Sequence, residues 1–168
     1  MTDPFTPPEL SRENAEQLLE AFATHRYGAE IVSDNDRLAF DARSISGEPL
    51  ELKACALRVR DGASRRRGRW YIREWSHNEL LAERGRYILG VYDRTPEIVA
   101  VASIPAARIE QLLSAKEWFD CHSSENGGLA TQLTYTRIFP SLDARLREDL
   151  APVSSSSERA VSDGGARR

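Results

Sequence analysis

The chain has 168 residues, of which 40% are apolar and 8% aromatic, a size and composition that suit one domain with its own core and are too small for two. The formal net charge of −3 excludes a protein that is basic over its whole surface, so any affinity for phosphate has to come from a local cluster. No apolar run approaches the ~20 residues of a membrane span, and the first residues lack the basic and apolar regions of a signal peptide. We therefore expect a cytoplasmic protein with no membrane contact. The absence of a glycine-rich phosphate loop and of a dinucleotide fingerprint predicts no organic cofactor.

The first half of the chain predicts a helix followed by a strand meander. Residues 6–28 begin with a capping box, formed by Thr6 and Glu9 around Pro7, and carry apolar residues at helical spacing. Strand patterns follow at 29–32, 37–42 and 50–58, separated by clusters of turn-forming residues.

The second half continues the alternation of strands and helices. Residues 69–75 are predicted to be either the end of the meander's sheet or a separate strand, and Ser76 with Glu79 forms a second capping box that predicts the start of a helix. Further on, the patterns predict strands at 86–93 and 97–104, a helix from Pro105 to Leu113, a strand at 131–139 and a short helix at 142–150. This order is typical of an α/β layered domain over residues 1–150. Residues 151–168 are too poor in apolar side chains to fold and predict a disordered tail.

Lys53 is unusual because the chain has only two lysines but 21 arginines. In a strand, Glu51 and Lys53 lie on the same side, roughly 6 to 7 Å apart, and Leu50 and Leu52 lie on the other. An isolated Glu-x-Lys is most often a solvated ion pair. Here, however, antiparallel pairing across the intervening turn brings Asp41 next to Glu51. Two neighbouring carboxylates repel each other unless a cation lies between them, and Mg²⁺ is the hard cation that suits such oxygen ligands.

This arrangement of Asp41, Glu51-Leu52-Lys53 and a preceding helix that contains Glu16 resembles the PD-(D/E)XK nuclease superfamily. Its layout over residues 12–93 is most similar to the archaeal Holliday junction resolvases and their restriction-enzyme relatives. The resemblance implies a restriction-endonuclease-like layered α/β fold, with a central mixed β-sheet flanked by helices. It also implies a DNA endonuclease that depends on Mg²⁺, with Mn²⁺ as a substitute, and that acts as a homodimer.

The resemblance also implies roles for the individual residues. Asp41 and Glu51 would hold the metal with help from the Leu52 carbonyl, and Lys53 would orient the attacking water or stabilise the phosphate. A lysine suits this role because its ammonium is a compact charge whose pKa burial can lower, whereas a guanidinium stays protonated. Glu16 lies at the border of the helix's apolar stripe and is the candidate for a contact to a metal-bound water. Glu20 is the substitute, and a solvated helix face is the alternative for both.

Seven arginines between residues 58 and 73 form a second cluster, interspersed with Trp70 and Tyr71. We interpret it as a flexible loop that grips DNA phosphates, with aromatic rings available for packing or stacking; the alternative is a solvated loop without a ligand. The predicted nucleic-acid contacts are Arg58, Arg60, Arg65, Arg66, Arg67, Arg69 and Arg73.

Other chemistry-bearing residues make weaker candidates. The run Asp120-Cys121-His122 lacks the further cysteines and histidines that a zinc site needs, and adjacent Cys and His do not form a catalytic pair by adjacency alone. His77 is predicted to be exposed in the first turn of its helix, within reach of a phosphate. Trp118 and Phe119 are predicted to be core or dimer-contact residues.

These expectations favour a structure-selective endonuclease that cuts four-way DNA junctions. Two alternatives share the fold: a restriction-type enzyme that reads a base sequence, and a catalytically silent DNA-binding or scaffold protein. A repair or RNA-directed nuclease with a single site is a further alternative. The intact Asp41, Glu51 and Lys53 argue against the silent protein, because a binder has no need to bring two carboxylates together.

Overall fold

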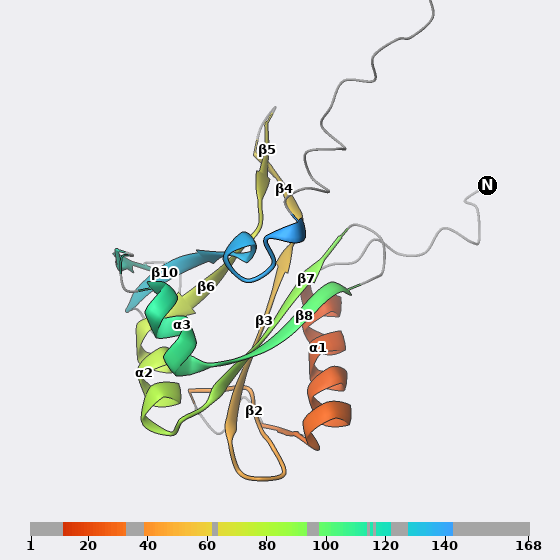
Figure 1. The fold of residues 1–168 in the computed structure, drawn as a ribbon, viewed down its shortest axis with the longest axis vertical. Helices are drawn as coiled ribbons and strands as arrows, with labels where there is room; N and C mark the ends of the chain where they lie inside the picture. The colour runs from red at the N-terminus through yellow and green to blue at the C-terminus, as the bar shows by residue number, and fades with distance from the viewer. Residues whose placement is uncertain are drawn as a thin grey trace, which may run out of the picture.

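The computed structural model describes residues 12–32, 39–61, 64–93, 98–113, 115, 117–121 and 128–142 (Figure 1). The predicted domain boundary at residue 150, the tail at 151–168 and the capping box of Thr6 and Glu9 lie outside these residues, as does most of the predicted helix 142–150. The elements in chain order are α1 (Arg12–Tyr27), β1 (Glu30–Ile31), β2 (Ala42–Arg43), β3 (Pro49–Ala56), β4 (Arg58–Asp61), β5 (Ser64–Arg67), β6 (Arg69–Arg73), α2 (Glu74–Ala82), β7 (Arg86–Tyr92), β8 (Ile98–Pro105), α3 (Ala106–Leu113), β9 (Phe119–Asp120), β10 (Leu129–Thr134) and a 3₁₀ turn at Tyr135–Arg137.

A five-stranded sheet with the order β1-β2-β3-β7-β8 forms the centre of the fold. The predicted meander β1-β2-β3 is antiparallel, β3 and β7 run parallel from Leu50 beside Arg86 to Ala56 beside Tyr92, and β8 returns antiparallel to β7. The prediction of a mixed central sheet flanked by helices is therefore confirmed. A smaller sheet with the order β6-β10-β9 packs beside it.

Alternate residues of β3 and β7 supply two cores, one on each face of the central sheet. On one face Leu50, Leu52 and Ile88 pack against α1 through Ala15 and Leu19. On the other face, residues of β3 and β7 pack against α2, α3, β6 and β10; the largest of these buried side chains are Trp70, Ile72, Leu80, Tyr87, Leu89, Ile109 and Leu133. The parallel strands are thus covered on both sides, as buried parallel strands require.

Gly90 permits the close approach of α1 to β7. A Cβ atom at this position would lie 2.7 Å from Cδ2 of Leu19. The backbone carbonyl of Gly90 also accepts a hydrogen bond of 3.1 Å from the indole Nε1 of Trp70, which comes from the other face of the sheet. Gly90 therefore contacts both cores, through Leu19 on one face of the sheet and Trp70 on the other.

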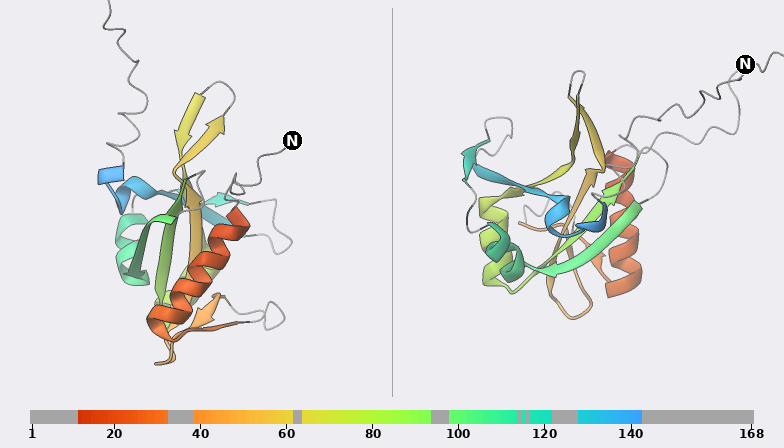
Figure 2. Two further views of the ribbon diagram at one scale, coloured as in Figure 1. Left: turned by 90° about the vertical axis from the view of Figure 1, so that its right-hand side faces the viewer. Right: turned by 45° about the horizontal axis from the view of Figure 1, so that its top comes forward.

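The arginine cluster forms a hairpin, and the prediction of a flexible loop there is wrong for the described residues. β4 and β5 pair antiparallel from Arg58 beside Arg67 to Asp61 beside Ser64, and the hairpin projects from the body of the domain (Figures 1 and 2). A strand is recognised in a sequence by alternating apolar and polar residues, and this run shows no such alternation because most of its side chains are arginines. At the base of the hairpin Gly68 passes so close to the Ala56 carbonyl that a larger residue does not fit.

The second capping box is also wrong. α2 begins at Glu74, two residues before the predicted cap, and its N-cap residue Arg73 makes no side-chain capping hydrogen bond. The hydroxyl of Ser76 instead donates to the backbone carbonyl of Ala39. The Ser76 hydroxyl thus bonds to a distant carbonyl and not to the backbone of its own helix. This bond connects α2 to the segment that leads to Asp41.

Several predicted strands are shorter in the structure. β2 consists of Ala42 and Arg43, so only Ala42 of the strand predicted at 37–42 belongs to it; Asp41 precedes it, and residues 37 and 38 are outside the described part. The strand predicted at 131–139 is β10, which ends at Thr134 before the 3₁₀ turn. In the described residues, no helix is both long enough and apolar enough to cross a membrane.

Candidate active site

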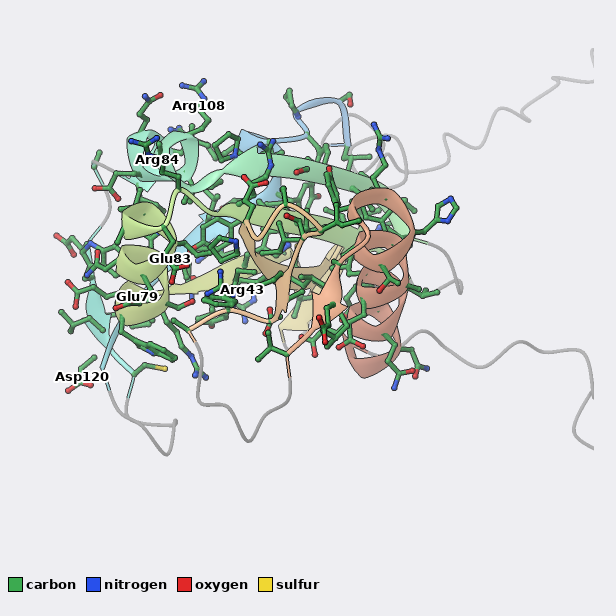
Figure 3. The ribbon with its side chains drawn as sticks, turned by 90° about the horizontal axis from the view of Figure 1, so that it is seen from below. Arg43, Glu79, Glu83, Arg84, Arg108 and Asp120 are labelled. Atoms are coloured by element: carbon green, nitrogen blue, oxygen red, sulfur yellow. The ribbon has the colours of Figure 1, made fainter. Side chains whose placement is uncertain are left out.

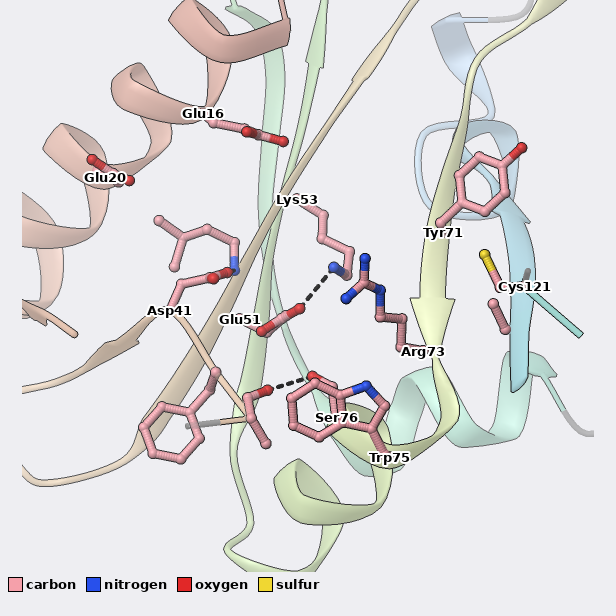
Figure 4. A pocket seen from close by; sticks show the side chains of 14 residues that line it. Glu16, Glu20, Asp41, Glu51, Lys53, Tyr71, Arg73, Trp75, Ser76 and Cys121 are labelled. Carbon is pink, nitrogen blue, oxygen red and sulfur yellow. Dashed lines mark hydrogen bonds and ion pairs between the residues drawn. The ribbon is translucent and has the colours of Figure 1, made fainter. Parts of the chain in front are cut away.

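A cleft of about 570 Å³ lies between α1 and β6, beside β3 (Figure 4). It contains all four predicted catalytic residues and one of the predicted nucleic-acid contacts. The residues that line it are Glu16, Glu20, Ala39, Phe40, Asp41, Glu51, Leu52, Lys53, Tyr71, Arg73, Trp75, Ser76, Cys121 and Ala130.

The cleft follows from the short length of β2. β2 pairs with β3 only at Pro49 and Leu50, so the central sheet order leaves the following residues of β3 without a strand beside them on that edge, among the residues described. The carboxylate of Asp41 takes the place of the missing strand, since its Oδ2 accepts a hydrogen bond of 2.7 Å from the backbone N–H of Leu52. Asp41 is thereby held at the open edge of β3.

Neighbouring contacts fix the segment around Asp41. Its backbone N–H donates to the Leu50 carbonyl at 3.0 Å, and the guanidinium of Arg43 lies 4.5 Å from the centre of the Phe40 ring. Arg43 also bonds to Glu83 beyond the end of α2 at 3.1 Å (Figure 3). This ion pair is half-exposed and contributes little energy by itself, but it ties the loop before β3 to α2.

Glu51 and Lys53 point to the same side of β3, as the strand period predicted. The ammonium of Lys53 lies 2.7 Å from Oε1 of Glu51, and Glu51 is only 7% exposed. Figure 4 shows this ion pair between Asp41 and the guanidinium of Arg73, which extends from β6 into the cleft. A buried carboxylate is costly without a partner, and the ammonium of Lys53 supplies that partner for Glu51.

The pKa of Asp41 is raised from its ordinary value of 3.8 to about 7. The protein packed around its carboxyl group is the largest cause, the charge of Glu51 is the second, and Glu16 on α1 adds to the effect, whereas the Leu52 N–H and Lys53 oppose it. Glu16 is therefore an electrostatic neighbour of Asp41. Glu20 lines the same cleft farther along α1.

In the presence of a chelator, Asp41→Asn is expected to stabilise the protein at pH 8 by about 1 kcal/mol, or roughly 2–4 °C in Tm. The folded state binds the proton of the Asp41 carboxyl group more tightly than the unfolded chain does. The stability of the wild type therefore falls as the pH rises from about 4 to about 7, and above that range it falls no further for this reason. Solvent reaches Asp41 and screens its charge, which keeps the gain small. Asparagine removes the charge and can still accept the Leu52 N–H.

Thermal unfolding at pH 8 and at pH 4 measures this effect. The gain should be much smaller at pH 4, where Asp41 is protonated in the folded wild type and, with its ordinary pKa of 3.8, still partly protonated in the unfolded chain. Glu20→Gln removes another carboxylate of the same cleft and is the matched control. An equal gain at both pH values would contradict the assigned repulsion.

Asp41 and Glu51 fit a divalent metal in their chemistry. In the described part of the chain, no three His, Cys, Asp or Glu residues form a preformed metal-binding group, so Asp41, Glu51 and Glu16 together are not one. Mg²⁺, however, usually takes only one or two protein carboxylates and completes its shell with water and phosphate oxygens. A pair of repelling carboxylates, one of which has a raised pKa, is a donor set of this kind.

The other predicted arginines lie outside the cleft. Arg69 is exposed on β6 and donates to Gln132 on β10 at 2.7 Å. Arg58, Arg66 and Arg67 belong to the β4–β5 hairpin, and Arg60 and Arg65 occupy hairpin positions that are described by their backbone alone. The seven arginines therefore divide into a hairpin group, formed by Arg58, Arg60, Arg65, Arg66 and Arg67, and a β6 group, formed by Arg69 and Arg73.

Of the two aromatic residues that line the cleft, Tyr71 was considered only as a ring within the arginine cluster, and Trp75 was not identified from the sequence. The signal was present in the run 69–73, where Trp70 and Ile72 are buried and alternate with exposed Arg69, Tyr71 and Arg73. A period of two assigns these residues to opposite faces, but it does not reveal which face meets β3.

The weaker sequence candidates occupy other environments. His77 is only 1% exposed, which makes the prediction of an exposed helix residue wrong: its Nδ1 lies 3.0 Å from the Tyr87 hydroxyl and its Nε2 lies 2.8 Å from Glu110. Trp118 packs against the core, as one of its two predictions stated, while Phe119 is 40% exposed.

The run Asp120-Cys121-His122 is described only in part. Cys121 lines the cleft, Asp120 lies on β9, and His122 is outside the described residues.

Comparison with known proteins identifies the family. No curated protein matches the chain. Residues 7–140, well over half of the sequence, match the model of the PD-(D/E)XK nuclease superfamily domain. The mixed five-stranded sheet and the three helices of the described residues agree with the restriction-endonuclease-like fold expected of such a domain. Both the sequence match and the fold lead to the same conclusion: the chain belongs to the PD-(D/E)XK nuclease superfamily.

Proposed function

We propose that this nuclease is a Mg²⁺-dependent DNA endonuclease whose catalytic residues are Asp41, Glu51 and Lys53, with Glu16 in support. The observation that carries the proposal is the convergence of the two carboxylates and the ammonium in one cleft. Phosphodiester hydrolysis needs a positioned water and positive charge near the phosphate. Lys53 and Arg73 supply the positive charge from the protein side of the cleft.

Asp41 and Glu51 are the residues that would hold Mg²⁺. When bound, the ion would polarise the phosphate and lower the pKa of a coordinated water. Leu52 adds a backbone ligand. Its N–H donates to Asp41, and because the N–H and C=O of one strand residue point to the same edge, its carbonyl also lies at the open edge of β3.

Lys53 acts at the water and at the phosphate. Its ion pair with Glu51 fixes the ammonium in the cleft before substrate binds. From there it can hydrogen-bond the attacking water or a phosphate oxygen, since an ammonium carries three donors. Arg73 approaches from β6 and can hold a second phosphate oxygen with its planar guanidinium. Glu16 is placed to accept a hydrogen bond from a water that is bound near Asp41.

The hairpin group is proposed to contact DNA phosphates. Directly opposed residues of an antiparallel pair share a face, so the register places Arg58 with Arg67 on one face and Val59 with Arg66 on the other. The hairpin thus gathers arginines on a segment that projects from the body of the domain (Figure 1). Such a local cluster of positive charge is typical of a contact to a phosphate backbone.

Replacing Arg65, Arg66 and Arg67 with alanine is expected to weaken DNA binding by a similar factor for unrelated sequences. Each lost phosphate contact should also reduce the slope of log K against log salt by about one. Fluorescence anisotropy with a labelled oligonucleotide, at about 50 to 200 mM salt, measures both the affinity and its dependence on salt. Arg108→Ala on α3 is the matched control. An unchanged slope would mean that these arginines are solvated and do not contact DNA.

We further propose that the enzyme selects branched DNA, with the four-way junction as its preferred substrate, and that it acts as a homodimer. Two symmetric cuts on opposite strands need two active sites. Contacts to the phosphate backbone carry no sequence information, so a molecule that binds mainly through arginines distinguishes the shape of its substrate. The predicted contacts here are arginines on one projecting hairpin and on β6.

A synthetic four-way junction and linear duplexes of the same sequences test this selectivity. With Mg²⁺, symmetric nicks near the branch point and slower cutting of the linear DNA are expected.

The hairpin also favours a second candidate, a restriction-type enzyme, because a two-stranded ribbon fits the major groove. Recurrent double-strand breaks at one sequence would identify that activity, and binding without cutting in several divalent metals would identify a silent DNA-binding protein.

A further inference from the structure

The face of β6 that lines the cleft carries exposed aromatic rings. Tyr71 is 48% exposed and Trp75, which follows β6 in the first turn of α2, is 40% exposed. The opposite face of β6 is fully used by the core, where Trp70 and Ile72 are buried. Large aromatic side chains that stay about half exposed beside a cleft are candidates for stacking on a flat ligand, because contacts within the protein cover only part of each ring.

These rings are held in place by their surroundings. The Tyr71 ring meets Phe119 of β9 edge to face, with 6.5 Å between the ring centroids and 84° between the planes. Trp75 stands directly before Ser76 and His77, which are both buried and bonded to Ala39 and Tyr87. The two rings therefore project from a rigid wall, a condition that reduces the entropy lost when a flat ligand stacks on them.

Positive charge accompanies the rings. Arg73 lies between Tyr71 and Trp75 on the chain and lines the same cleft, together with Lys53 across from it (Figure 4). Aromatic rings that alternate with cationic groups along a groove are how proteins bind single-stranded nucleic acid, where bases stack and the backbone follows the charges. The opposite wall carries Glu16 and Glu20, which repel phosphates and favour a backbone path along β6.

The size of the cleft suits a nucleotide. A volume of about 570 Å³ lies in the range of pockets for small organic ligands. A base can stack on the rings of this cleft only when it is free of its complement, because a paired base is covered on both sides inside the duplex.

We propose that the cleft takes an unpaired stretch of the substrate strand, whose bases stack on Tyr71 and Trp75 while its backbone passes Arg73 on the way to Lys53. This inference rests on the proposed DNA endonuclease function and narrows its substrate class to DNA with unpaired nucleotides at the cut, such as an opened branch point or a boundary between single and double strand. Tyr71 and Trp75 position the strand; the hydrolysis itself stays with the residues of β3 and Asp41.

Binding without cutting tests the stacking. In a chelating buffer, fluorescence anisotropy compares a labelled single strand, a splayed-arm DNA and a blunt duplex. Tyr71→Leu and Trp75→Leu should each weaken binding of the first two by between about 5-fold and 100-fold and change duplex binding by less than about 2-fold. Tyr71→Phe and Trp75→Phe keep a ring and should restore most of the affinity. Ile45→Ser changes an exposed apolar residue that does not line the cleft, and is the control.

Tryptophan fluorescence distinguishes the stacking of a base on Trp75 from a change in the shape of the protein. The single strand should quench the tryptophan fluorescence of the wild type, and the quenching should be lost in Trp75→Phe, which retains Trp70 and Trp118. Equal losses for single strand and duplex, or unchanged binding in both leucine variants, would overturn the proposal. So would a concentration-dependent fluorescence change without DNA that accompanies dimer formation, because it would assign the rings to a contact between two copies of the chain.

Failure of this inference is distinguishable from failure of the proposed function. If the protein cuts DNA with Mg²⁺ while the leucine variants bind single strands normally, only the stacking is wrong. If no DNA is cut in any divalent metal while the leucine variants lose single-strand binding, the stacking stands and the nuclease reaction on DNA does not.

Discussion

Replacing Lys53 with alanine is expected to reduce the rate of DNA cleavage by about 10²–10⁴-fold, the usual contribution of a positioned proton-transfer group. DNA affinity should change by less than about 3-fold, because a single ammonium is one of several cationic contacts along the strand. The structure gives the reason for this asymmetry. Lys53 lies beside Glu51 at 2.7 Å within the cleft, whereas the hairpin group lies outside it.

Single-turnover cleavage with enzyme in excess measures the chemical step separately from binding. Lys53→Arg should restore little activity, because a guanidinium is wider and cannot lose its proton near neutral pH. Lys116→Ala, which changes the chain's only other lysine, is the matched control and should cut at the wild-type rate. Cleavage by Lys53→Ala at more than a tenth of the wild-type rate would remove Lys53 from the catalytic residues.

Removing the metal, or removing Asp41, is expected to lower cleavage by at least about 10³-fold. The reason is that the charge stabilisation supplied by a divalent ion amounts to several kcal/mol, and each 1.36 kcal/mol is worth about tenfold in rate. Excess Mg²⁺ or Mn²⁺ after chelation should restore the wild type and leave Asp41→Ala inactive. Glu51→Gln should behave similarly, although it also releases Lys53 from its ion pair.

Calorimetry supplies a readout that does not depend on activity. Titration of Mn²⁺ should give a binding signal with the wild type that Asp41→Ala lacks, and Glu20→Gln should bind normally because Glu20 lies farther along α1. Full cleavage in chelator, or wild-type metal binding by Asp41→Ala, would contradict the assignment of the carboxylate pair.

The geometry around Lys53 could be predicted because it depends on local rules. The two-residue period of a strand places Glu51 beside Lys53, and a short turn between antiparallel strands brings Asp41 to them. Glu16 could be placed on the correct side of α1 from helical periodicity alone.

The features that sequence patterns missed depend on distant partners. His77 is buried because Tyr87 and Glu110, on two other elements, satisfy both ring nitrogens. Ser76 is not a helix cap because its hydroxyl finds the Ala39 carbonyl. The position of Tyr71 and Trp75 in the cleft could not be predicted for a related reason: Tyr71 faces β3 only because β6 belongs to a separate sheet that packs across the cleft.

The brevity of β2 has a consequence for solubility. An uncovered strand edge is a template on which a second polypeptide can add as a further strand, which is a common route to aggregation. β3 has such an edge beyond Leu50, yet the Leu52 N–H is already bonded to Asp41, and a carboxylate there repels the carbonyl groups of an incoming strand. Lys53 and Glu51 add charge beside it. The residues that open the sheet for a substrate thus also protect its edge against misassembly with another chain.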